Sequence, residues 1–285
     1  MSILIIVICG LLSCTKVTTQ GSLARKSIFN ANDAILANCC IFALTALMFS
    51  MSLFKGIDVP VIGYAALFGA FSASFQIFYA LALRSGPFSI TCMLVNLGMV
   101  LPVSYSLLFL GERLTLVKGI GLALCLIALF LNTQRDNAKI SLKWLIYAVL
   151  AFLSTGTLST VQKVYAKSTH AGDLMQFLFW GYLTAFVITF AVSSVQKARK
   201  QEINFKPDRS NILAICVIVL CLGMFQLLNT YANSFVDAAV LNPSVSGLST
   251  MFLTLSGRIV FKEKFTAKQL CAIGVGLAGI LLISM

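Results

Sequence analysis

Charged side chains inside long apolar stretches are the residues of this sequence best suited to bind a solute. Lys16 lies about two-thirds along an apolar stretch at 3–22, with no acidic residue near it in the sequence. An ionisable group inside a membrane span is costly unless it faces a cavity or a partner, so it marks a candidate site. A buried lysine at this place would bind a carboxylate or a phosphate. The alternative is a lysine that snorkels to the membrane surface.

Amides and phenols form a second candidate group. Gln76 and Tyr79 lie three residues apart, as do Gln226 and Asn229, so each pair shares one helix face. Tyr231 follows the second pair closely. These side chains can hydrogen-bond a solute while the aromatic rings stack on it. The alternative is polar contact between helices, worth about 0.6 kcal/mol for each contact.

Two asparagines near prolines form a third candidate group. Asn96 precedes Pro102 in one apolar stretch, and Asn242 directly precedes Pro243 in another. A proline inside a membrane helix leaves a backbone carbonyl without its helical partner, which creates a kink. The kink could serve as a hinge or ligand site, or it could be a static bend.

The distribution of the other reactive residues excludes several functions. The nine acidic residues lie at the ends of apolar stretches or in loops, so Lys16 is the only charge expected to be buried, and an anionic or zwitterionic solute is favoured. The nine cysteines lie within apolar stretches and only one histidine is present, so we expect no metal, cofactor or disulfide framework. A membrane-embedded enzyme would need a cluster of His, Asp or Glu, and the sequence offers none.

Composition predicts which elements position these residues. The chain has 285 residues, of which 59% are hydrophobic and 11% charged, whereas soluble proteins carry about 25% charged residues. A helix that crosses a bilayer needs about 20 apolar residues. The sequence therefore predicts an all-α polytopic membrane protein with ten transmembrane helices. The expected spans are 3–22, 33–54, 60–83, 87–110, 115–132, 142–163, 173–195, 211–234, 236–257 and 266–284.

The two halves of the chain resemble each other. Glu112 and Glu263 lie 151 positions apart in similar turns between apolar stretches, and Phe75-Gln76 recurs as Phe225-Gln226. We therefore expect two five-helix repeats, at 1–137 and 138–285. Because five is odd, the second repeat enters the membrane from the opposite side. Such a 5+5 inverted repeat is typical of secondary transporters that work by alternating access.

The basic residues lie mainly in loops on one side of the expected membrane. Loops after odd-numbered spans carry fifteen Lys or Arg and loops after even-numbered spans carry five. The positive-inside rule then places the odd-numbered loops in the cytoplasm and both termini outside. The net charge of +12 does not indicate nucleic-acid binding, because no soluble segment is long enough to form a basic face.

Three features carry a family resemblance: the ten spans as five plus five, the segment Tyr79-Ala80-Leu81-Ala82-Leu83, and the turn Gly111-Glu112-Arg113-Leu114-Thr115. Together they resemble the drug/metabolite transporter superfamily, in particular its EamA-type ten-span permeases. The resemblance implies a permease of the cytoplasmic membrane, often an exporter, with both termini in the cytoplasm.

The function expected from the residues and the resemblance is transport of small polar metabolites such as amino acids or organic anions. The alternative is a multidrug or toxic-compound exporter with an apolar aromatic pocket. The expected partners are a small-molecule solute and membrane lipid, without nucleic acid. The protein is expected to act as a monomer or a homodimer.

Overall fold

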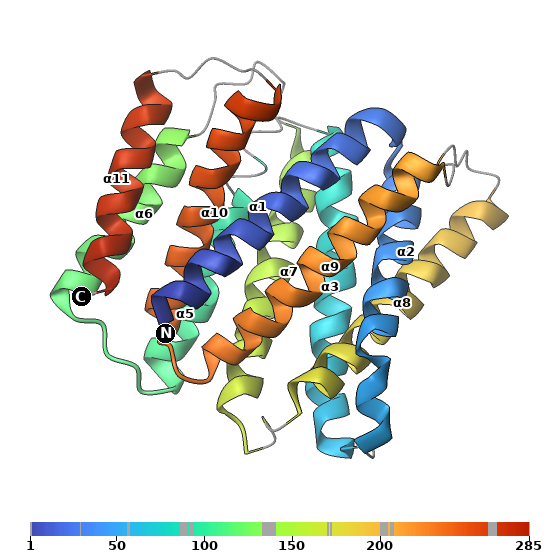
Figure 1. Ribbon diagram of the computed structural model, residues 1–285, viewed down its shortest axis with the longest axis horizontal. Helices are drawn as coiled ribbons and strands as arrows, with labels where there is room; N and C mark the ends of the chain where they lie inside the picture. Colours follow the sequence, from blue (N-terminus) through green and yellow to red (C-terminus); the bar gives the residue numbers. More distant parts are fainter. Residues whose placement is uncertain are drawn as a thin grey trace.

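All the secondary structure in the described part of the chain is helical (Figure 1). The computed structural model describes residues 2–28, 30–55, 58–85, 91, 94–132, 141–169, 171, 173–199, 205, 208–261 and 267–284. The elements are α1 (Ser2–Ser27), α2 (Ala31–Phe49), η1 (Ser50–Lys55), α3 (Val59–Ser85), η2 (Leu97–Met99), α5 (Val100–Phe109), α6 (Leu116–Asn132), α7 (Leu142–Lys167), α8 (Leu174–Ala198), α9 (Arg209–Asn233), α10 (Ala238–Phe261) and α11 (Ala267–Ser284).

Among the residues that the structure describes, six helices are long and apolar enough to cross a bilayer, and they confirm the prediction of an all-helical membrane protein. They extend over Ile3–Leu23, Asn32–Ser52, Val59–Leu83, Leu142–Lys167, Leu174–Ala198 and Arg209–Asn233. Shorter apolar helices occupy Leu94–Phe109, Leu116–Ala128 and Cys271–Leu282.

The span expected at 87–110 differs from the prediction. Residues 86–90 and 92–93 lie outside the described residues, and the helix from Leu94 tightens into the 3₁₀ turn η2 before α5. Gly98, inside η2, explains the tight geometry: a Cβ built there would lie 2.5 Å from the Thr155 methyl group of α7. The 3₁₀ turn therefore packs almost directly on the backbone of α7.

Most of the helix packing joins the first part of the chain to the second. α3 packs on α7 and α8, α2 packs on α8, α1 packs on α9 and α10, and α6 packs on α11. Figure 1 shows α1 lying along α9, and α6 paired with α11 at one edge of the bundle. Each candidate side chain is therefore positioned mainly by helices distant from it in sequence.

Glycines occupy the closest helix crossings. A Cβ at Gly69 of α3 would lie 2.1 Å from the carbonyl oxygen of Gly181 in α8, and one at Gly279 of α11 would lie 2.9 Å from the carbonyl oxygen of Gly121 in α6. Small residues allow such close approach between membrane helices. The α3–α8 and α6–α11 crossings both join the two parts of the chain.

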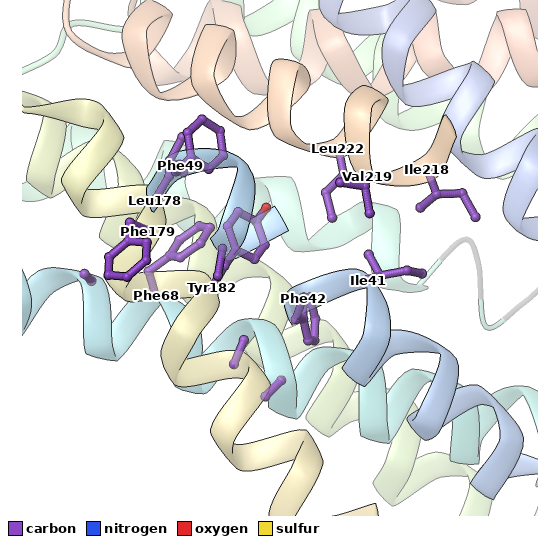
Figure 2. Packing of buried hydrophobic residues seen from close by; sticks show 14 of the residues in the cluster. Ile41, Phe42, Phe49, Phe68, Leu178, Phe179, Tyr182, Ile218, Val219 and Leu222 are labelled. Carbon is purple, nitrogen blue, oxygen red and sulfur yellow. The ribbon is translucent and has the colours of Figure 1, made fainter. Parts of the chain in front are cut away.

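The main apolar core lies between α2, α3, α8 and α9 and is rich in aromatic rings (Figure 2). The Tyr182 ring lies 5.8 Å from Phe68, edge to face, and 5.9 Å from Phe42. In the same core, Phe177 of α8 lies 5.1 Å from Phe68 and stacks on Tyr165 of α7 at 4.1 Å. This core fixes the relative positions of the helices around the candidate site.

At the end where α1 leads into α2, a carboxylate joins the two parts of the chain. Asp33 is fully buried, and its Oδ2 accepts a hydrogen bond from the backbone N–H of Asn30 at 3.1 Å. Its Oδ1 accepts a second bond from the backbone N–H of Phe205, also at 3.1 Å. A carboxylate at a helix N-terminus also interacts favourably with the helix dipole. Asp33 thus holds the segment before α9 against the start of α2.

Candidate functional site

A cluster of buried amides joins α7 to α9. Gln162 Nε2 donates to Gln226 Oε1 at 2.8 Å and to Thr230 Oγ1 at 2.9 Å. Asn229 Nδ2 donates to Gln162 Oε1 at 3.4 Å. These four side chains, called here the amide cluster, are all buried. The cluster contains two of the sequence-predicted residues, Gln226 and Asn229, on the one helix face expected for them.

A tyrosine hydroxyl lies beside this cluster. Tyr182 is fully buried and interacts electrostatically with the Gln226 side chain. Figure 2 shows its oxygen turned toward Leu222 and Val219 of α9. Buried hydroxyls normally meet a polar group, and the Gln226 side chain is the one beside this hydroxyl.

Lys16 lies near the middle of α1, in the interface with α9. Its Nζ lies 5.8 Å from the centre of the Phe225 ring, and it interacts electrostatically with Cys221 one turn earlier on α9. A cation over an aromatic ring is weakly stabilised by the ring quadrupole. In the described residues, no carboxylate lies within ion-pair distance of Lys16. Its charge is therefore available to an anionic group.

The buried lysine Lys163 corrects the prediction that Lys16 is the only buried charge, and Lys16 itself is half-buried. The expected span ended at Lys163, which placed this residue beside a loop, but α7 continues to Lys167 and the Lys163 side chain is fully buried. Lys163 Nζ lies 2.7 Å from Glu112 Oε1, so its charge is neutralised. Asp33 is also buried, and its carboxylate accepts the two backbone hydrogen bonds described above.

The remaining predicted residues lie apart from the amide cluster or at its margin. Gln76 and Tyr79 are half-buried on α3, where the Tyr79 ring stacks on Phe75 at 5.4 Å. Within the described structure, no hydrogen bond joins Gln76 to the amide cluster. Tyr231 is 43% exposed and contacts Phe235, on the opposite face of α9 from Gln226.

The two asparagines near prolines are both half-buried. Asn96 lies directly before η2 and its side chain makes no capping hydrogen bond. Asn242 Nδ2 donates to the Ala238 carbonyl oxygen at 3.2 Å, one turn earlier in α10. Pro243 is buried inside α10. Asn242 therefore bonds its own helix, whereas the Asn96 amide is not used in a helix cap.

One signal in the sequence would have identified Gln162 and Lys163, which the prediction missed. Gln162 and Lys163 are adjacent polar residues at the end of an expected span. Extending that span by four residues, to Lys167, would have placed both a turn inside the helix and not at its end. Their burial depends on packing against α9 and on the turn after α5, which the sequence alone does not specify.

A donor set for a metal ion is missing from what the structure describes. No group of three His, Cys, Asp or Glu side chains there could hold a metal ion. The polar groups that do converge are the amides and the hydroxyl of the amide cluster. Such groups can bind and release a solute by hydrogen bonds.

Comparisons with known proteins agree with this chemistry. The sequence profile of the EamA-like transporter family matches residues 2–134 and 142–285. A solved crystal structure, described only as that of a protein, has a TM-score of 0.78 and 16% sequence identity, and the match covers 99% of this chain and 95% of that one. This likeness extends over the whole fold. No curated protein matches the sequence. Because the family profile covers nearly the entire chain in two consecutive copies, the protein belongs to the EamA-like transporter family and is a multi-pass membrane transporter.

Proposed function

We propose that this transporter carries small polar metabolites with an anionic group, such as amino acids or organic anions, out across the cytoplasmic membrane. Lys16 carries the proposal, because its ammonium group lies in mid-helix without a carboxylate partner in the described structure. An unpaired charge inside a membrane is costly. A solute carboxylate or phosphate would compensate it.

The neighbouring polar groups suit the rest of such a solute. Gln226 follows Phe225, the ring beneath Lys16, and the Tyr182 hydroxyl lies beside the Gln226 amide. Amide and hydroxyl groups recognise hydrogen-bonding solutes without adding charge. We include Gln76, Tyr79, Asn96, Asn229, Tyr231 and Asn242 as further proposed binding residues.

We further propose that the chain is built as a 5+5 inverted repeat, with halves at 1–137 and 138–285, that works by alternating access. The helix packing supports this arrangement. When both helices of a contact are replaced by the helices at the same positions of the other half, the result is again an observed contact. The α3–α7 pair becomes α9–α1, the α3–α8 pair becomes α9–α2, and the α6–α11 pair maps onto itself. Such exchange is expected of halves related by a pseudo-two-fold axis.

Ligand-induced thermal stabilisation of the detergent-purified protein tests the proposed solute class. The panel contains amino acids, organic anions, nucleobases and cationic dyes, each assayed with the parent protein, Lys16→Met and Lys26→Met. A ligand that binds only the folded state raises Tm by mass action. Lys26 is exposed on the same helix and serves as the matched control.

We expect anions or zwitterions to raise Tm in the parent protein and in Lys26→Met, with at least about tenfold weaker binding in Lys16→Met, equivalent to about 1.4 kcal/mol. Stabilisation by cationic dyes that survives Lys16→Met would contradict the anion proposal. That outcome would favour the multidrug exporter. Uptake into proteoliposomes loaded with unlabelled solute then tests transport of any ligand found.

A further inference from the structure

A buried ion pair joins the two halves at the end of the molecule where α7 and α9 end and α10 begins. Glu112, in the turn between α5 and α6, places Oε1 2.7 Å from Lys163 Nζ of α7. The two side chains are 8% and 0% exposed. Each ion also bonds the segment that leads into α10. Lys163 Nζ donates to the Val236 carbonyl oxygen at 2.6 Å, and Glu112 Oε2 accepts from the Ala238 backbone N–H at 2.8 Å.

This arrangement differs from an ordinary surface ion pair. The Glu112 carboxylate lies at the N-terminus of α10, where the helix dipole and free N–H groups favour a negative charge. A second ion pair, between Lys118 Nζ and Asp237 Oδ2 at 3.0 Å, lies beside it with side chains 21% and 44% exposed. The outer pair is screened by water, whereas the inner pair is not. Removing water strengthens the attraction between two charges many-fold.

The inner pair lies next to the proposed binding region. Lys163 directly follows Gln162, the residue that holds the amide cluster together. Asn233 Nδ2 donates to the Asn229 carbonyl oxygen at 2.9 Å, which extends the polar column along α9 toward the ion pair. Buried polar groups thus extend from Gln226 to this end of the bundle. The ion pair lies across their outer end.

We propose that Glu112 and Lys163 form a latch that closes this end of the molecule against water and opens during transport. The inference rests on the transport function proposed above but not on the identity of the solute. Opening moves the start of α10 and the turn after α5 away from α7. Water then hydrates both ions, and a hydrated pair contributes little. The ion pair therefore stabilises the closed state. Because water hydrates both ions on opening, the free-energy cost of opening stays small.

Labelling of a thiol introduced at Thr230 tests the latch. Thr230 is fully buried in the amide cluster, so Thr230→Cys reports water access from this end. We propose to measure its reaction with a charged methanethiosulfonate by peptide mass spectrometry, which distinguishes it from the native cysteines. The comparison is made with Glu112→Gln plus Lys163→Met, because this double variant leaves neither charge buried alone.

We expect the double variant to raise the labelling rate at position 230 at least about tenfold, a change of 1.4 kcal/mol in the opening equilibrium. The native Cys39 of α2, which is 4% exposed, should label no faster. Lys118→Met, which breaks only the exposed pair, is the matched control and should leave the rate at position 230 unchanged.

Two results would overturn the latch. One is an unchanged labelling rate at position 230 in the double variant. The other is an equal increase at Cys39, which would indicate loosening of the whole bundle. Neither result depends on Lys16, so a failed latch and a failed solute assignment are distinguishable. Lys16→Met should weaken ligand binding at least about tenfold while leaving labelling at position 230 unaffected.

Discussion

At the scale of single residues, Gln162 connects the largest number of buried polar groups in the candidate site. Its amide nitrogen bonds both Gln226 and Thr230, and its oxygen accepts a bond from Asn229. All four side chains are buried, so loss of Gln162 removes one hydrogen-bond partner from each of the other three. A buried polar group without a partner costs more free energy than a net hydrogen bond contributes.

We therefore expect Gln162→Leu to lower the free energy of unfolding by about 1–3 kcal/mol, the cost of leaving buried polar groups unpaired. Thermal unfolding in detergent measures the change. Adding Gln226→Leu should cost less than the sum of the two single changes, because the residues share a bond. Strict additivity would show that the bond between them contributes nothing.

At the scale of the helices, close crossings determine which side chains face each other. The α3–α8 crossing brings Gly69 and Gly181 together, and the adjacent aromatic core contains Phe68 and Tyr182. A shift between these helices would displace the Tyr182 hydroxyl from Gln226. The glycine contact therefore supports the site from a distance.

Gly69→Ala tests this contact, because the added Cβ would lie 2.1 Å from the Gly181 carbonyl oxygen. Overpacking of this kind costs about 1–3 kcal/mol, so we expect a lower Tm and weaker solute binding. Gly63→Ala is the matched control on the same helix, since nothing lies within 4 Å of its added Cβ. It should be neutral, or stabilising by up to about 1 kcal/mol through helix propensity. Equal effects of the two substitutions would contradict the crossing.

At the scale of the whole molecule, the two ends of the bundle are joined differently. Asp33 joins the halves at one end through backbone N–H groups, whereas Glu112 and Lys163 do so at the other end through opposite charges. Glu263, the expected counterpart of Glu112, lies outside the described residues. The burial of Lys163 also removes one base from the loops after even-numbered spans, which strengthens the charge asymmetry.

This asymmetry predicts that the start of α9 faces the cytoplasm and the turn after α5 faces outward. A membrane-impermeant thiol reagent should label Arg113→Cys in intact cells and Ser210→Cys only after permeabilisation. Both positions are exposed in the structure. The reverse pattern would show that the termini lie in the cytoplasm, as the family resemblance implies.

The positions of most helices were predictable because apolar length and polar interruptions directly reflect the thickness of a bilayer. The helix expected at 142–163 occupies Leu142–Lys167, and that expected at 211–234 occupies Arg209–Asn233. The 3₁₀ turn at Leu97–Met99 was not predictable, because it accompanies close packing of Gly98 on α7. The sequence of 87–110 carries no local signal for that partner.

From the sequence alone, an all-helical membrane protein with few polar residues in its apolar stretches could be predicted, and Lys16, Gln226 and Asn229 could be recognised among those polar residues. Which of the polar residues meet depends on the tertiary structure. Gln162 and Gln226 are 64 positions apart, and Lys163 and Glu112 come from different halves. A bilayer selects apolar length along each helix, but the pairing of buried polar groups depends on how the helices pack against one another.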